Sequence, residues 1–225
     1  ESASSPGSGG PSRAEGTGHP FSREAGQPYL LQADRPVLAL GQVHHMYLVA
    51  QIGPELHIVD QHTAHERVLF ERLTRAWTTQ QVVVQPLLIP EPVELPPHAA
   101  GGVERHLADL EKLGIVLEPF GVGTFLIRAM PALLSCLDYG ALVQDLVDDL
   151  SQWNTTSSLE TRVRPVLASL ACHGAVRAGR AMELPEMTQL LKEWVEEGLP
   201  STCPHGRRVA LRFSADELHK IFGRV

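Results

Sequence analysis

The sequence has few cysteines, no long apolar run and fewer basic than acidic residues, and each shortage excludes a class of protein. Three cysteines are too few for a disulfide framework, which favours a reducing, cytoplasmic setting. No apolar run is long enough to span a bilayer, so we expect no membrane partner. The 19 basic residues against 26 acidic ones give a net charge of −7, whereas a protein that binds DNA unaided normally has a basic surface. If this chain acts on DNA, something else must bring it there.

The first 28 residues differ in composition from the rest. They are rich in Gly, Ser and Pro and almost free of large apolar side chains, which predicts a flexible linker over residues 1–28. They also lack the features of a signal peptide, and there is no initiating Met. We therefore expect a further domain upstream of the linker.

The remaining chain alternates strand and helix patterns, which predicts an α+β fold. A β-rich meander occupies residues 37–59, and a helix follows from about His62 to Trp77. Prolines at positions 92, 96 and 97 mark a boundary. Residues 97–154 then read as a small unit with two helices and a hairpin, and helices return from residue 159 to a last strand and helix. We predict a unit built from residues 29–96 and 155–225, with residues 97–154 inserted between them.

The most informative stretch is Asp-Gln-His-Thr-Ala-His-Glu-Arg-Val-Leu-Phe-Glu, residues 60–71. It places a carboxylate, an imidazole and a second carboxylate where a strand gives way to a helix. His62 and Glu66 are four residues apart and share one helix face, and Asp60 ends the strand beside them. These three residues favour a bound cation.

Soft ligands for the same ion occur far downstream, at Cys172 and in Cys203-Pro204-His205. Cys203 and His205 are two residues apart, so an extended backbone points both to one side. Thiolate and imidazole favour Zn²⁺, while carboxylates also accept harder ions such as Mn²⁺. Each residue alone has an ordinary alternative on the surface or in the core, so the prediction depends on their combination. Six ligands would suit two ions, or one ion with open positions.

The three motifs resemble those of the MutL mismatch-repair family, in its endonuclease-bearing branch. Residues 60–71 resemble its D-Q-H-A-x-x-E-x-x-x-x-E signature, Ala171-Cys172 its Ala-Cys motif, and residues 203–207 its C-P-H-G-R-P motif. The resemblance covers about residues 36–225 and includes the hairpin at 121–128. Thr63 and Arg208 depart from the family pattern and remove no ligand.

The resemblance implies a C-terminal dimerisation and endonuclease domain with an inserted external subdomain. The implied metal ligands are Asp60, His62, Glu66, Cys172, Cys203 and His205, with Asp60 and Glu66 catalytic. Gln61, Glu71 and Arg207 are expected to support the ligands; Glu71 suits an ordinary salt bridge equally well, and Arg207 a carboxylate or a phosphate. The implied cofactors are Zn²⁺ and Mn²⁺, or Mg²⁺, whereas ATP belongs to an N-terminal domain that this chain lacks.

A second motif, Gln85-Pro86-Leu87-Leu88-Ile89-Pro90, matches the Q-x-x-[L/I]-x-P pattern of ligands of the replicative sliding clamp. Gln85, Leu88 and Pro90 would be the contact residues, although such a sequence also occurs in core strands.

The sequence therefore predicts a metal-dependent DNA-nicking endonuclease in mismatch repair, with a second copy, DNA, the sliding clamp and the mismatch-recognition protein MutS as partners. The alternative is a zinc-stabilised dimerisation and recruitment module that cuts nothing. A metalloprotease is excluded because no H-E-x-x-H helix motif is present.

Overall fold

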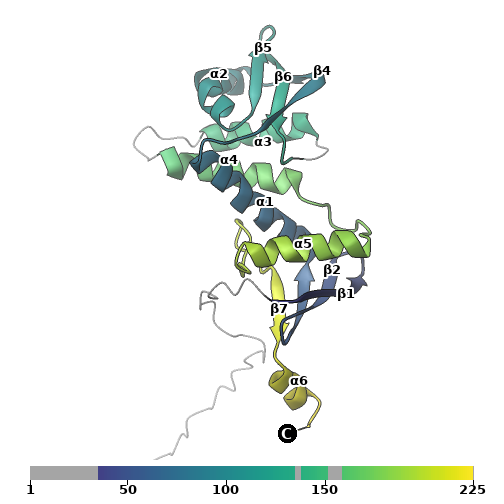
Figure 1. The fold of residues 1–225 in the computed structure, drawn as a ribbon. Coiled ribbons are helices and arrows are strands. Elements are labelled where there is room, and N and C mark those ends of the chain that lie inside the picture. Colours follow the sequence, from purple (N-terminus) through teal and green to yellow (C-terminus); the bar gives the residue numbers. More distant parts are fainter. Residues whose placement is uncertain (1–34, 135–137, 152–158, 225) are drawn as a thin grey trace, which may run out of the picture.

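The protein is described from a computed structural model that covers residues 35–134, 138–151 and 159–224. It is an α+β protein in which two antiparallel sheets lie at opposite ends of an elongated body, with helices between them (Figure 1). The predicted α+β class is confirmed. Neither the predicted linker, residues 1–28, nor Cys136 is among the described residues. The subdomain boundaries at residues 96 and 154 stay predictions.

The first sheet has the strand order β1-β2-β3-β7, all antiparallel. Its strands are β1 (Val37–Val43), β2 (Tyr47–Ile52), β3 (Glu55–Asp60) and β7 (Ala210–Phe213). Along β2, Leu48, Ala50 and Ile52 are fully buried at every second position, as the two-residue period of a strand requires. One face of this sheet is therefore buried in a hydrophobic core.

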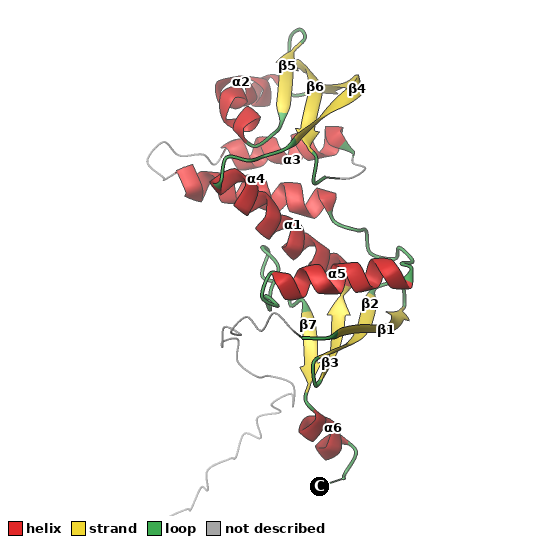
Figure 2. Cartoon of the chain, in the orientation of Figure 1, coloured by secondary structure: helices red, strands yellow, loops and turns green. Residues whose placement is uncertain are grey.

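Helix α5 (Leu184–Glu196) covers that face (Figure 2). Its Trp194 and Leu191 pack with the buried residues of β2 and β3 into one hydrophobic cluster. The opposite face lacks such a cover in the described chain, and Leu38, Leu40 and Leu211 are 55%, 54% and 39% exposed there. Helix α6 (Ala215–Ile221), capped by Ser214, projects beyond the sheet (Figure 1).

The second sheet has the order β4-β6-β5. Its strands are β4 (Val84–Glu94), β5 (Val116–Pro119) and β6 (Thr124–Pro131), and helices α2 (Pro97–Lys112) and α3 (Tyr139–Ser151) pack beside it. A larger hydrophobic cluster fills this end of the molecule. It also takes in side chains of helix α4 (Leu159–Gly174).

Helix α1 (Gln61–Thr78) connects the two cores. Ala64 and Val68, near its start, belong to the first cluster, whereas Leu69, Phe70 and Leu73 belong to the second. Glu66 lies between Ala64 and Val68 in the sequence and is completely buried. The helix that both clusters share therefore also carries a buried carboxylate.

One strand, β4, is not among the elements predicted above. It runs through Pro90 and continues to Glu94. Pairing with β6 is interrupted between Pro86 and Glu91. The four residues 87–90 therefore stand opposite a single residue, Arg128, and form a large β-bulge. Proline is tolerated there because β4 is an edge strand. No helix in the described parts of the chain is long and apolar enough to cross a membrane.

Candidate metal centre

Asp60 forms the N-cap of α1. Its Oδ1 accepts a hydrogen bond from the Thr63 amide at 3.0 Å, which satisfies one of the unpaired N–H groups at the helix start. The backbone N–H of Asp60 donates to the Val209 carbonyl at 2.9 Å. Asp60 thus ties the start of the helix to the segment that follows the Cys203–His205 motif.

The segment 201–209 folds as a tight turn that presents this motif. The Cys203 amide donates to Arg207 O and the Gly206 amide to Cys203 O, both at 2.9 Å. Gly206 adopts a φ of +82°, a left-handed conformation that glycine tolerates at no steric cost. The turn therefore holds the Cys203 and His205 side chains against α1.

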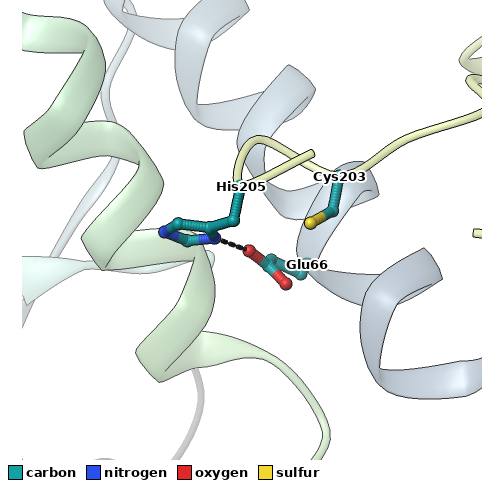
Figure 3. A group of neighbouring side chains, drawn as sticks. All are labelled: Glu66, Cys203 and His205. Carbon is teal, nitrogen blue, oxygen red and sulfur yellow. Dashed lines mark hydrogen bonds and ion pairs between the residues drawn. The ribbon is translucent and has the colours of Figure 1, made fainter. Parts of the chain in front are cut away.

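Glu66, Cys203 and His205 meet there, with their ligand atoms within 4.8 Å of one another (Figure 3). His205 Nδ1 contacts Glu66 Oε1. Arg207 Nη2 donates to the other carboxylate oxygen, Oε2, at 2.6 Å. Burying an ionised carboxylate is costly unless it is paired and hydrogen-bonded, so His205 and Arg207 together account for a fully buried Glu66.

Arg207 also hydrogen-bonds the Cys203 side chain. That bond is the largest of several contributions that raise the pKa of Arg207 above its usual range, and the attraction of Glu66 adds to it. The guanidinium therefore contacts two of the three clustered side chains.

Two histidines of α1 bind the backbone of one residue, Val176, in the segment after α4. His62 Nδ1 lies 2.9 Å from the Val176 carbonyl oxygen, a contact in which the ring must donate. His65 Nδ1 accepts from the Val176 amide, also at 2.9 Å. Because His62 uses Nδ1 as a donor, its Nε2 keeps a lone pair, and that atom lies 3.9 Å from Glu66 Oε2.

His65 is not among the predicted site residues, yet it contacts the same backbone residue as His62. Burial lowers its pKa, which keeps the ring neutral and able to accept. The only signal in the sequence was its position three residues after His62, on a neighbouring part of the helix surface.

Cys172 approaches the group from α4. Its thiol pKa is raised first by burial and then by the negative charge of Glu66, with a smaller contribution from Cys203. Cys172 is therefore near both residues, although it does not belong to the group within 4.8 Å. Its neighbour His173 turns away and binds Asp145 of α3 through Nε2 at 2.7 Å.

Three other predicted site residues have structural contacts of their own. Asp60 caps the helix and stands outside the group within 4.8 Å. The buried amide of Gln61 donates to the carbonyls of His45 and Arg180, at 2.9 and 3.0 Å, and so joins the β1–β2 turn to the segment after α4. Glu71 forms an ion pair with Arg67 along the helix, as its ordinary alternative predicts.

The donors that the fold assembles suit a divalent cation. A carboxylate, a thiol and an imidazole from separate segments are the ligand types that Zn²⁺ takes, and His62 and Cys172 stand next to them. A cavity of about 300 Å³ opens beside His205 and is lined also by Arg164, Ser169 and Asp149. The group is thus reachable from solvent on this side.

The segment 85–90 belongs to β4, an edge strand of the other sheet (Figure 1). At the bulge Leu88 is 98% exposed and Ile89 80% exposed, whereas Leu87 packs against the core. Gln85 is exposed and Pro90 half-buried. The structure therefore presents this motif on the surface instead of using Leu88 in the core.

Comparison with known proteins shows which family the chain belongs to. The family described as MutL C terminal dimerisation domain matches residues 40–182, a range that includes Asp60 to Glu71 and Cys172. The chain is 44% identical over 186 residues to the DNA mismatch repair protein MutL of Paramagnetospirillum magneticum, which is 83% of this chain and 31% of that protein. It is 40% identical over 202 residues to the MutL of Azorhizobium caulinodans, covering 89% of this chain and 32% of that protein. The chain thus spans about a third of the length of these relatives. It belongs to the MutL C-terminal dimerisation domain family.

Proposed function

We propose that this chain is a metal-dependent DNA-nicking and dimerisation domain that acts in mismatch repair. The observation that supports the nicking activity best is the meeting of Glu66, Cys203 and His205, which come from α1 and from the turn 201–209. A fully buried carboxylate next to a thiol and an imidazole is costly in a fold, and a bound cation would offset that cost. The family and the names of the relatives support the role in mismatch repair.

The chain's own residues prepare this site for a cation. Glu66 supplies a carboxylate, Cys203 and His205 supply sulfur and nitrogen, and His62 presents a lone pair whose direction is set by the Val176 carbonyl. Cys172 and Asp60 complete the proposed set. A divalent cation held there would supply the electrophilic activation that phosphodiester hydrolysis needs. The cavity beside His205, with Arg164 in its lining, opens next to these ligands.

The test compares three carboxylates, the N-cap Asp60 and two residues of α1, Glu66 and Glu71. Glu66→Gln and Asp60→Asn should each abolish Mn²⁺-dependent nicking of supercoiled plasmid, because an amide cannot replace the charge. Glu71→Gln is the matched control: its carboxylate pairs with Arg67 and lies outside the clustered group, so nicking should continue. Metal content by elemental analysis should fall in Glu66→Gln and Cys203→Ser. Nicking by Glu66→Gln at the wild-type rate would place the chemistry elsewhere.

The alternative, a dimerisation and recruitment module without nuclease activity, has an observation of its own. The uncovered face of the first sheet exposes Leu38, Leu40 and Leu211, and α6 beyond it ends in Ile221 and Phe222, 58% and 73% exposed. Burying such surface against a second copy would stabilise a symmetric pair. We infer that this face is the homodimer contact.

Sedimentation distinguishes the two activities. Leu38→Arg with Leu211→Arg should yield monomers at micromolar concentration, whereas Glu66→Gln should remain dimeric. A dimer that survives both arginines would mean that another surface forms the contact.

The segment 85–90 supports recruitment by the sliding clamp. A bulge on an edge strand with Leu88 almost fully exposed can insert that side chain into an apolar pocket without unfolding the sheet. Since the net charge of −7 opposes DNA binding, tethering through a clamp that encircles DNA would raise the local concentration of the site. MutS and an upstream ATPase domain are further partners that the family resemblance implies.

Loaded clamp should therefore stimulate nicking. Gln85→Ala with Leu88→Ala should remove the stimulation and leave the basal Mn²⁺-dependent rate unchanged. Val83→Ala, 70% exposed just before the same strand, is the matched control and should be stimulated normally. Equal stimulation of all three proteins would show that the match to the clamp pattern is a coincidence.

A further inference from the structure

We propose that Arg207 is an internal competitor for the metal position, and that binding of a cation displaces its guanidinium from Glu66 and Cys203. The inference rests on the metal site proposed above and adds a residue that controls its affinity. It also predicts what the displaced side chain is then free to bind.

The contacts of Arg207 are those that a bound cation would make. Nη2 lies 2.6 Å from Glu66 Oε2, and the guanidinium also hydrogen-bonds the Cys203 side chain. These are two of the three side chains that cluster within 4.8 Å. One positive group therefore already satisfies a carboxylate and a sulfur that would serve as ligands.

A metal ion and the Arg207 guanidinium cannot both bind these atoms without strong repulsion. Zinc binds carboxylate oxygen at about 2.0–2.2 Å and thiolate at about 2.3 Å, so it would lie roughly 3–4 Å from a guanidinium that kept both of its hydrogen bonds. At that separation in a partly buried site, like charges repel strongly. A metal must therefore break the Arg207 contacts, and the free energy of those contacts is lost from the binding affinity.

Arg207 is placed so that it can leave. Its side chain is 51% exposed although its partner Glu66 is fully buried, and it follows Gly206 in a surface turn. His205 and Pro204 of the same turn line the cavity beside the site. A guanidinium released there is the side chain best suited to a phosphate oxygen pair. Metal loading would thus turn an internal counter-ion into a cation available to the phosphodiester backbone.

The next residue offers a matched control. Arg208 carries the same charge one position along the chain and has an exposed side chain, and its backbone pairs with Thr202. Replacing either arginine by methionine removes one positive charge from the same turn. Only Arg207→Met removes the contacts to Glu66 and Cys203.

The experiment measures Zn²⁺ and Mn²⁺ affinity by competition with a chromophoric chelator in wild type, Arg207→Met and Arg208→Met. Hydrogen bonds to charged groups typically correspond to about a ten- to hundredfold change in an equilibrium constant. Arg207→Met should therefore bind both metals about tenfold or more tightly than wild type, and Arg208→Met within about twofold of it. Unchanged or weaker binding by Arg207→Met would overturn the proposal, and so would an equal gain in Arg208→Met, which would indicate charge alone.

A measurement on the wild type avoids any folding defect of the variants. Zinc titrated into protein with ¹⁵N-labelled arginine should shift the Arg207 guanidinium resonance as its hydrogen bonds break. A resonance that stays unchanged while one equivalent of zinc binds would refute displacement. If no protein binds metal at all, the proposed metal site fails as well, which separates that outcome from failure of this inference alone.

Discussion

Acidification should destabilise this domain through one buried histidine. His57 on β3 is fully buried, with its ring edge against the Trp194 ring at a centroid distance of 6.0 Å. Glu55 Oε2 lies 3.4 Å from Nε2, but neither ring nitrogen has a hydrogen-bond partner in the described chain. Burial lowers the pKa of His57 from 6.5 to about 4, against a smaller pull from Glu55. The folded protein therefore holds this ring neutral.

The sign of the effect follows from proton binding. Between pH 6.5 and about 4 the unfolded chain binds a proton on His57 that the folded chain does not, so acid favours unfolding. The stabilisation is complete above pH 6.5 and decreases as the pH falls toward the folded pKa. A shift of this size corresponds to about 3 kcal/mol at most, since one pKa unit is about 1.4 kcal/mol.

Urea denaturation followed by circular dichroism at pH 7.5, 6, 5 and 4.5 would measure this effect. A metal chelator should be present throughout, so that loss of a bound ion does not imitate it. His57→Leu has no proton to bind, so its free energy of unfolding should fall less steeply than that of wild type below pH 6.5. His98→Leu, which removes an exposed histidine, should follow wild type. Parallel pH profiles for wild type and His57→Leu would refute the reasoning.

Three further predictions concern the walls of the site. Gly174→Val should lower the free energy of unfolding, measured by urea titration, by roughly 1–3 kcal/mol. The reason is that a Cβ at Gly174 would lie 2.7 Å from Leu134 and 3.2 Å from Leu69. A variant as stable as wild type would contradict this close packing. Gln61→Leu should cost roughly 1–3 kcal/mol in the same assay because it removes two hydrogen bonds, one to the His45 carbonyl and one to the Arg180 carbonyl. Proteolysis in the segment after α4 should accelerate, and an unchanged cleavage pattern would show that these bonds do not hold the segment. His65→Leu should weaken Co²⁺ binding and alter the visible absorption of the bound ion, because it removes the acceptor for the Val176 amide. His65→Asn should restore both, since its Oδ1 replaces the accepting Nδ1. Equal spectra for the two variants would mean that the Val176 bond does not orient His62.

Sequence patterns predicted the local elements well because periodicity reports directly on burial. The alternation along β2 and the helical stripe of α1 both reappear as buried side chains. The spacing of His62 and Glu66 likewise placed them on one helix face, and their closest atoms are 3.9 Å apart. These relations depend only on neighbours along the chain.

The remaining contacts depend on tertiary packing, which no local pattern encodes. Nothing in the sequence shows that Arg207 reaches Glu66, 141 positions away, or that His65 meets Val176. The Asp60 side chain has a capping role that competes with its predicted role as a ligand, and the sequence cannot rank the two. The extension of β4 beyond Pro90 was missed because proline normally ends a strand, and only the edge position in the sheet permits it.

Helix α1 has a mechanical consequence as well. With 18 residues it is a stiff rod about 27 Å long that is shared by both hydrophobic clusters. Since both clusters pack on this one helix, unfolding of either one removes packing from α1 and from the segment that holds Glu66. The two ends of the molecule should therefore unfold together as one cooperative unit.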